Sequence, residues 1–206
     1  MKIDKDKVYT YGKYSYVNFT KLSYEELLQV LEWRNHPDVR KCMNNIGYIS
    51  EKEHLAFCKS LKFKSDTFYW VIVKENQHIG VLNIIDVDYE NCTCEPGFYL
   101  SPSIMGHGES LFVLSNYKSF LLNSLGFKGL VGHNYYDNKP AFSFTIFFGG
   151  LITELQYIGG RFSVKTLLTK ENFKNGDGTE KLISKYAKFI REWNADEEIN
   201  KFKNEK

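Results

Sequence analysis

The sequence predicts an α/β protein with a central mixed β-sheet that helices flank. Three observations predict this class. First, strand-like and helix-like segments alternate in the order β, αα, βββ, α, β, α, ββ and a final helix. Second, three consecutive strands precede a single crossover helix, so we expect antiparallel pairing first and a parallel step across that helix. Third, a glycine pair, Gly106 and Gly108, stands where the crossover helix begins.

The N-terminal elements follow from local signals. The stretch YSYVNFTKL (14–22) is rich in aromatic and β-branched residues, which favour a strand. Two capping boxes, each a serine with a glutamate three residues later, open the next two main helices, and Pro37 starts a short helix between them. The boxes and their helices are Ser23 and Glu26 for 24–35, and Ser50 and Glu53 for 51–62.

The remaining elements follow from hydrophobic periodicity and from turn residues. Residues 67–88 form two apolar stretches around the polar turn 74–77, which predicts a hairpin. A third strand spans 92–102, where Pro96 and Gly97 predict a bulge or a splay. We then expect a helix over about 108–125, a strand over 127–136, a helix over 140–149, a hairpin over 151–169 and an amphipathic helix from about 179.

Length and composition limit the function classes. The 206 residues fit one domain, 1–177, with a tail helix over 178–206 that either covers the domain or forms a homodimer. A net charge of +2 does not favour nucleic-acid binding, no apolar run is long enough to cross a membrane, and the charged N-terminus is not a signal peptide. Four cysteines without metal-ligand spacing predict free thiols, no metal site and a cytoplasmic location.

The stretch SPSIMGHGES (101–110) predicts an anion site. Glycines at a helix N-terminus leave backbone N–H groups uncovered, where the helix dipole is positive. A plain helix-entry loop is the alternative, since glycine is tolerated there. Its position between a strand and a helix favours phosphate binding.

Three motifs resemble the GNAT superfamily of N-acetyltransferases. The superfamily's phosphate loop reads Gln/Arg-x-x-Gly-x-Gly/Ala, and residues 103–108 match both glycines but carry Ser103 first. Asn138 to Ala141 match the superfamily's Asn-x-x-Ala. The stretches 31–43 and 49–62 resemble the sugar-nucleotide N-acetyltransferases of pseudaminic acid synthesis, which acetylate UDP-4-amino-4,6-dideoxy-N-acetyl-β-L-altrosamine for flagellin glycosylation.

This resemblance implies an acetyl-CoA-dependent N-acetyltransferase with the GNAT fold. The loop would hold the CoA pyrophosphate, and the Asn-x-x-Ala segment would lie beside the pantetheine arm. The cofactor-binding residues that it implies are Leu100, Ser103, Met105, Gly106, His107, Gly108, Glu109, Ser110, Asn138, Ala141 and Phe144. Within this loop, Glu109 is expected to cap the helix, and His107 to point outward without a catalytic role.

The resemblance places catalysis on the third strand and its neighbour. Glu95 would take the proton of the attacking amine, directly or through water, with a solvated edge carboxylate as the alternative. Because Pro96 has no N–H, the oxyanion donor would come from the backbone of Phe98 or Tyr99. Asn83 would face the acceptor and hold the sugar, and the Tyr99 side chain would contact the nucleotide.

Two residues of the N-terminal helices match nucleotide contacts in the sugar-nucleotide subfamily. Arg34 suits a diphosphate, because its planar guanidinium donates two parallel hydrogen bonds. His54 would also contact the nucleotide, with a buried structural histidine as the equal alternative. One residue departs from the superfamily pattern: Thr145 stands where a tyrosine usually protonates the departing sulfur.

The sequence therefore predicts an N-acetyltransferase that acetylates the amine of a nucleotide-linked amino sugar. Acetylation of a protein N-terminus, of the ribosomal-protein type, is the main alternative within the fold. A catalytically silent acyl-CoA-binding module is the alternative from another class.

Overall fold

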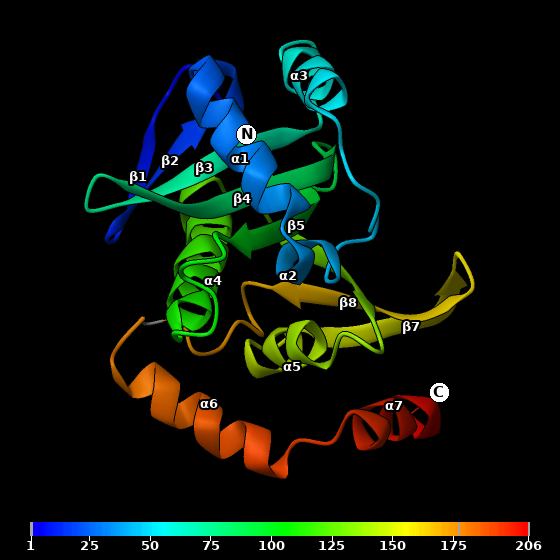
Figure 1. Cartoon of the computed structure of the whole chain (residues 1–206). Coiled ribbons are helices and arrows are strands. Elements are labelled where there is room, and N and C mark those ends of the chain that lie inside the picture. Colours follow the sequence, from blue (N-terminus) through cyan, green and yellow to red (C-terminus); the bar gives the residue numbers. More distant parts are fainter. Residues whose placement is uncertain (1, 177, 206) are drawn as a thin grey trace. The chain divides into compact units, whose positions relative to one another are not determined.

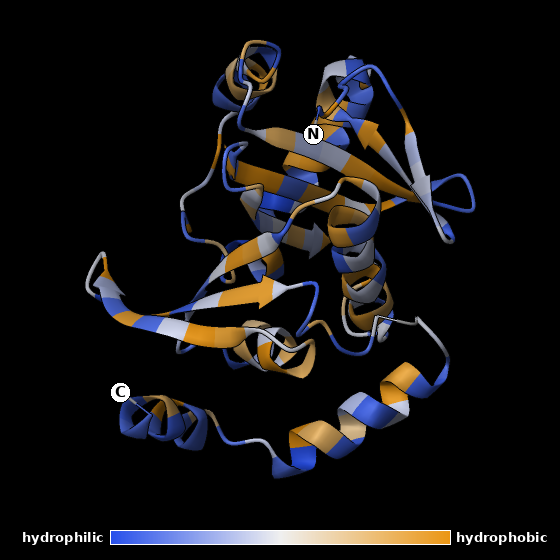
Figure 2. Cartoon of the chain, turned by 180° about the vertical axis from the view of Figure 1, so that it is seen from behind, coloured by the Kyte–Doolittle hydropathy of each residue, from blue (hydrophilic) through white to orange (hydrophobic). Residues whose placement is uncertain are grey.

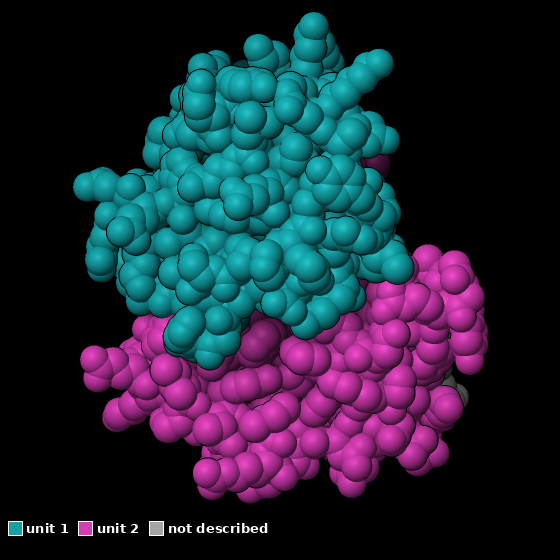
Figure 3. Space-filling view, viewed as in Figure 1, with its two compact units in different colours: residues 1–89, 96–110 teal, residues 90–95, 111–206 magenta. Residues whose placement is uncertain are grey.

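A computed structural model describes residues 2–176 and 178–205. Within these residues the chain divides into two compact units (Figure 3): unit 1 comprises residues 1–89 and 96–110, and unit 2 comprises 90–95 and 111–206. The chain therefore changes unit after residue 89, again inside strand β5 (Thr93–Leu100), and a third time near the start of helix α4 (Glu109–Ser119). Each unit is described on its own below.

Unit 1 is built on antiparallel strands with helices (Figure 1). Strands β1, β2, β3 and β4 pair in sequence order, and the pairs β1–β2, β2–β3 and β3–β4 are antiparallel, as expected. The bounds are β1 Tyr9–Tyr11, β2 Tyr14–Asn18, η1 Phe19–Lys21, α1 Tyr24–Asn35, α2 Pro37–Arg40, α3 Glu51–Ser60, β3 Phe68–Lys74 and β4 Gln77–Asp88.

The local signals of unit 1 explain its helices. Both predicted capping boxes are present, since the Ser23 and Ser50 hydroxyls accept from the N–H groups of Glu26 and Glu53, whose carboxylates bond back. Pro37 occupies the first turn of α2, as predicted. The expected strand over 14–22 is shorter, because the Asn18 side chain accepts from Thr20 N–H and begins the 3₁₀ helix η1.

The core of unit 1 lies between its helices and strands. Its buried residues come from η1, α1, α3 and the C-cap of α3, β3 and β4, and comprise Phe19, Val30, Cys58, Leu61, Val71 and Val81. The β3–β4 turn consists of two residues with positive φ, Glu75 and Asn76. Two such residues form a tight hairpin, so the turn fixes where Lys74 ends β3.

Unit 2 combines a parallel step with an antiparallel hairpin. Strand β5 pairs with β6 in parallel at Thr93–Gly129 and Cys94–Leu130, as expected across a crossover helix, and β8 pairs antiparallel with both β6 and β7. The strand order through both units is β1-β2-β3-β4-β5-β6-β8-β7. The remaining bounds are η2 Phe120–Ser124 (a π-helix), β6 Gly129–Tyr135, α5 Lys139–Phe147, β7 Leu151–Ile158, β8 Arg161–Thr169, α6 Lys181–Glu192 and α7 Ala195–Asn204.

The tail differs from the expected single helix: α6 ends at Glu192 and α7 begins at Ala195. The Asn194 side chain accepts from the N–H groups of Asp196 and Glu197 and so caps a second helix. Figure 2 shows that α6 alternates hydrophobic and hydrophilic residues. The hydrophobic face of α6 packs on α5 through rings of Phe144, Phe147, Tyr186 and Phe189.

Among the described residues, none of the helices combines the length and hydrophobicity required to cross a bilayer.

Candidate active site

The glycine turn of unit 1 exposes backbone donors. Gly106 and Gly108 both have positive φ, 84° and 80°, which only glycine adopts without strain. Within the described residues, no hydrogen bond uses the N–H groups of residues 106–108. The first N–H groups of α4, from Glu109 on, are also free of helical partners by geometry. This turn can therefore bind an anion such as a phosphate.

The approach to this turn is unobstructed by protein. A Cβ built on Gly106 would meet no atom within 4 Å, and His107 is exposed, as expected. Upstream, the Ser101 and Ser103 hydroxyls lie 3.1 Å apart and the N–H groups of Ile104 and Met105 donate to the Ser101 carbonyl. Leu100 is buried and Ser110 is half-buried. The turn thus begins from a hydrogen-bonded bend.

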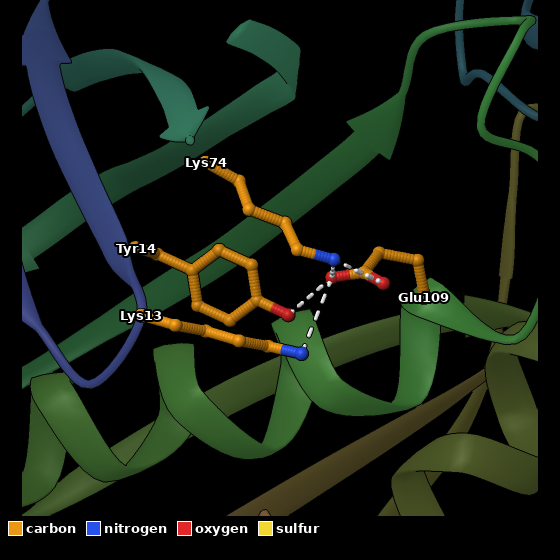
Figure 4. Close-up of polar contacts among 4 residues, drawn as sticks. All are labelled: Lys13, Tyr14, Lys74 and Glu109. Carbon is orange, nitrogen blue, oxygen red and sulfur yellow. Dashed lines mark hydrogen bonds and ion pairs between the residues drawn. The ribbon is translucent and has the colours of Figure 1, made fainter. Parts of the chain in front are cut away.

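Glu109 has a role that the sequence did not reveal. Its carboxylate accepts from the Tyr14 hydroxyl at 2.5 Å and from Lys74 Nζ, 3.0 Å from both oxygens, and Lys13 Nζ lies 3.8 Å away (Figure 4). Burial raises the pKa of Glu109, but the hydrogen bonds from Tyr14 and Lys74 outweigh this and hold the pKa below its ordinary value. The carboxylate therefore links the start of α4 to the β1–β2 and β3–β4 hairpins.

Arg34 lies in the last turn of helix α1 in unit 1. Its Nη2 donates to the Asn45 carbonyl at 2.6 Å, while its Nη1 is buried without a hydrogen-bond partner among the described residues. Burial raises the pKa of both Tyr69 and Tyr99, and the Arg34 charge opposes this shift for both rings. The guanidinium therefore lies near two tyrosines, and its buried Nη1 has no hydrogen-bond acceptor among the described residues.

The loop that follows α2 is held in place by backbone contacts. Arg40 Nε donates to the Ile46 carbonyl at 2.9 Å, and the Asn35 amide both donates to and accepts from the Ile49 backbone. Ile46 and Tyr48 on this loop are 60% and 71% exposed. The loop therefore presents two large apolar side chains while its backbone is fixed.

Asn83 contacts the strand that carries Tyr99. A Cβ built on Gly97 would lie 2.7 Å from Asn83 Oδ1, so the Asn83 side chain fills the space that a residue other than glycine would need. Asn83 and Gly97 therefore lie close together within unit 1. This contact explains why a glycine stands at position 97.

Of the two roles expected for His54, a nucleotide contact or a buried structural histidine, its surroundings favour the second. It is 5% exposed, and its Nε2 lies 2.9 Å from the Leu27 carbonyl, to which it donates in the neutral form. Burial lowers the pKa of His54, because it disfavours the charged form of the ring. This histidine joins α3 to α1, and we assign it no substrate contact.

Unit 2 brings Glu95 to a histidine. His133 Nδ1 lies 2.7 Å from Glu95 Oε2, and both side chains are about three-quarters buried. Thr93 of β5 pairs in parallel with Gly129 of β6. Glu95 and His133 follow these two residues along the same two strands. His133 therefore holds one of the two carboxylate oxygens of Glu95.

The Asn-x-x-Ala segment forms the start of α5. The Asn138 side chain caps the helix by accepting from Ala141 N–H at 3.4 Å. Phe144 packs on Tyr186 of α6 with ring centroids 4.9 Å apart, and the Tyr186 hydroxyl lies 2.8 Å from Ser143 Oγ. Phe144 therefore has a partner from the tail, which the sequence did not predict.

Thr145 stands where the superfamily usually carries a tyrosine, and its hydroxyl is used within the protein. Its hydroxyl donates to the Ala141 carbonyl at 3.0 Å and lies 3.4 Å from Asn134 Oδ1. The Asn134 amide Nδ2 is buried with no partner among the described residues. Asn134 could not be singled out from the sequence, because a polar residue on a strand is informative only when its neighbours in the fold are known.

The described part of the chain contains no cluster of three or more His, Cys, Asp or Glu side chains that could hold a metal ion. All four cysteines are free thiols, and Cys58 and Cys94 are buried.

The chain matches known acetyltransferases over most of its N-terminal two-thirds. The family described as Acetyltransferase (GNAT) domain matches residues 17–145. Two curated proteins named Acetyltransferase PseH, from Campylobacter jejuni subsp. jejuni strains 81-176 and NCTC 11168, are 32% and 30% identical over 124 residues. The match covers 60% of this chain and 76% of each relative.

Solved structures share the fold. The C. jejuni N-acetyltransferase PseH in complex with acetyl coenzyme A superposes with a TM-score of 0.61 at 22% identity, over 76% of this chain and 99% of that one. Vibrio cholerae spermidine N-acetyltransferase in complex with CoA and spermine gives 0.68 at 13% identity, over 78% and 97%. Mycobacterium smegmatis RimJ in complex with CoA-disulfide gives 0.67 at 12% identity, over 83% and 88%.

Proposed function

The chain belongs to the GNAT family of acetyltransferases, and on that premise we propose that it transfers the acetyl group of acetyl-CoA to the amine of a nucleotide-linked 4-amino sugar. The similarity to the PseH acetyltransferases supports this acceptor class, which is the one used in pseudaminic acid synthesis and flagellin glycosylation. The expected cytoplasmic location belongs to the same proposal and agrees with four free cysteines.

The glycine turn fits the pyrophosphate of acetyl-CoA. Its uncovered N–H groups stand at a helix start, and nothing in the protein fills the space beside Gly106. Glu109 would repel a phosphate, but the Lys74 ammonium balances its charge and the Tyr14 hydroxyl donates a hydrogen bond to it. We assign Ser103, Met105 and Ser110 to the rim of this site, and Asn138, Ala141 and Phe144 to the pantetheine arm.

Glu95 is proposed as the base. The neutral amine forms the new C–N bond at the thioester carbonyl while the C–S bond breaks, the bonding electrons stay on sulfur, and the amine proton passes to Glu95 directly or through water. His133 holds the carboxylate by a 2.7 Å contact. Backbone N–H groups at Phe98 or Tyr99 are proposed to stabilise the oxyanion, since Pro96 has none.

The observation that carries the choice of acceptor is the buried, unpartnered Nη1 of Arg34. A guanidinium with one arm on a backbone carbonyl and the other buried without an acceptor can take a phosphate oxygen. Tyr99 and Asn83 belong to the same unit and are proposed to contact the nucleotide and the sugar. A diphosphate-linked acceptor therefore suits unit 1 better than a plain amine does.

The test compares Arg34→Lys with Arg40→Lys. Both arginines donate to a carbonyl of the same loop, at Asn45 and Ile46, but only Arg34 has a buried Nη1 without a partner. We expect Arg34→Lys to raise the KM for a UDP-linked 4-amino sugar by about tenfold or more, because a single lysine ammonium cannot replace both Nη2, which donates to the Asn45 carbonyl, and Nη1, which is proposed to donate to the phosphate. The KM for acetyl-CoA should not change, and Arg40→Lys should change neither KM by more than about threefold.

Acetylation is followed by mass spectrometry with three acceptors, namely the UDP-4-amino sugar, spermidine and a peptide with a free N-terminus. Activity on spermidine or on the peptide alone would contradict the proposed acceptor. An equal rise in both KM values for Arg34→Lys would mean that Arg34 serves the fold. Binding of acetyl-CoA without turnover of any amine would favour a silent binding module.

A further inference from the structure

Tyr69 lies on strand β3 of unit 1 and carries a hydroxyl group that the proposed function has not used. Among the described residues, neither the Tyr69 hydroxyl nor the Tyr99 hydroxyl makes a hydrogen bond. The Tyr14 hydroxyl of the same unit, in contrast, donates to Glu109 at 2.5 Å. Since a tyrosine hydroxyl inside a protein usually has a partner, the hydroxyls of Tyr69 and Tyr99 indicate a place where a ligand supplies one.

The sheet of unit 1 presents Tyr69 and Tyr99 on one face. Tyr69 pairs with Asn83 across β3 and β4, so these two side chains point to the same side of the sheet. Asn83 fills the space beside Gly97 of β5, and Tyr99 follows two positions later, which returns the chain to that same side. Tyr69 and Tyr99 also pack against the core of unit 1. The two hydroxyls therefore belong to one face of the sheet.

Helix α1 brings the Arg34 guanidinium to this face. Leu27, Val30 and Arg34 are three and four residues apart, so they share one side of the helix, and the first two lie in the same core as the tyrosines. The Arg34 charge acts on the pKa of both tyrosines, and Tyr69 acts on the pKa of Tyr99. The buried Nη1 of Arg34 and the two hydroxyls are therefore three donors in one region, and none has an acceptor among the described residues.

This region is open at one end. Val71 and Val81 lie two residues along their strands from Tyr69 and Asn83, on the same face, and both are fully buried. Tyr69, Asn83 and Tyr99 are partly exposed. The face therefore leads from a closed core to an accessible end, and the three donors lie at that end.

We propose that Tyr69 is a further specificity-determining residue, whose hydroxyl donates a hydrogen bond to the same phosphate group of the acceptor as Arg34 Nη1, with the Tyr99 hydroxyl as a third donor. This inference rests on the proposed function, because it requires an acceptor that carries a diphosphate. Phosphate oxygens only accept hydrogen bonds, so they match a set of donors. A polyamine acceptor is cationic and would be repelled by the guanidinium.

The protonation state of Tyr69 agrees with a donor role. Burial raises the pKa of Tyr69, so its hydroxyl keeps the proton at neutral pH. The ring itself is held by aromatic contacts, with centroids 5.5 Å from Phe19 and 5.1 Å from Phe57. Tyr69→Phe therefore removes the donor and keeps the ring packing.

The test measures binding of UDP to Tyr69→Phe by calorimetry. We expect the dissociation constant of UDP, and the KM for a UDP-linked 4-amino sugar, to rise about tenfold or more, because a hydrogen bond to a charged group is lost. The kcat and the KM for acetyl-CoA should stay within about twofold of the wild-type values. Because the hydroxyl has no partner within the described part of the chain, the melting temperature of the ligand-free variant should not fall.

Tyr24→Phe is the matched control, because the Tyr24 hydroxyl lies in the same unit but donates to Glu51 at 2.6 Å. It should leave the dissociation constant of UDP within about twofold. A UDP affinity that Tyr69→Phe does not change would overturn the inference. A lower melting temperature of ligand-free Tyr69→Phe would also overturn it, because the hydroxyl would then serve the fold. Wild-type protein that acetylates spermidine but neither binds UDP nor acetylates the UDP-linked sugar would overturn the proposed function, and this inference with it.

Discussion

The contacts of Glu109 with Lys74 and Tyr14, here called the Glu109 anchor, hold the start of α4, and removing the Lys74 ammonium tests them. Lys74 Nζ lies 3.0 Å from both oxygens of Glu109, and the two side chains are 25% and 15% exposed. Hydrogen bonds to a charged group contribute about 1.5–3 kcal/mol when buried. Discounted for partial exposure, Lys74→Met should lower the free energy of unfolding by about 1–2 kcal/mol, since Tyr14 still donates. For a chain of this size that corresponds to a melting temperature lower by roughly 2–8 °C.

The pH dependence of this loss has a definite sign. The pKa of Glu109 is held below its ordinary value, so the anchor contributes stability above the unfolded pKa of about 4.3 and loses it as the pH falls through the lower folded value. The difference between wild-type protein and Lys74→Met should therefore be full at pH 7 and shrink below about pH 4. Denaturant unfolding at both pH values measures it.

Lys13→Met is the matched control for the anchor. Lys13 Nζ lies 3.8 Å from Glu109 and is half-exposed, so its removal should cost no more than about 0.5 kcal/mol. A double-mutant cycle of Lys74→Met with Glu109→Gln isolates the pair. A coupling free energy below about 0.3 kcal/mol, or equal losses at pH 7 and at pH 3, would refute the reasoning.

Two further predictions concern CoA binding and proton transfer. Gly106→Ala should weaken CoA binding at least about tenfold, measured by calorimetry, because the new Cβ would meet no protein atom but would stand where a phosphate is proposed to bind. The positive φ at this position should separately lower the free energy of unfolding by about 1–2 kcal/mol. Unchanged CoA affinity would place the pyrophosphate elsewhere. Glu95→Gln should lower kcat most at low pH, where the amine is still charged, and a flat pH profile with little loss of rate would make Glu95 a bystander.

Most of the fold could be predicted because its signals are local. The capping boxes at Ser23 and Ser50 and the hairpin before Gln77 depend on residues close in sequence. The parallel step after β5 could be predicted because a single crossover helix stands between the two strands. Strand β1 was missed, because three residues inside a charged N-terminal stretch carry little periodicity. The break between α6 and α7 had a readable signal, Asn194 followed by two acidic residues, that the long amphipathic pattern concealed.

The candidate site was harder to predict, because its contacts join distant segments. The glycine turn could be recognised from spacing alone, and its backbone conformation agrees with that interpretation. The pairings of Glu109 with Lys74 and of Glu95 with His133 bridge 35 and 38 positions in the sequence, and no pattern within one element specifies them. The direct roles of the site residues in catalysis and binding stay predictions.

The interleaving of the two units limits how this chain can be recombined with its relatives. Residues 90–95 belong to unit 2 although they interrupt unit 1, so Glu95 and Pro96 are neighbours in sequence but members of different units. In a chimera with a single crossover after residue 89, residues 1–89 come from one parent and all later residues from the other. Unit 1 is then divided, because its glycine turn comes from a different parent than the rest of the unit. Crossovers at 89/90, 95/96 and 110/111, used together, would exchange whole units and keep the Glu109 anchor and the Glu95–His133 pair each within one parent.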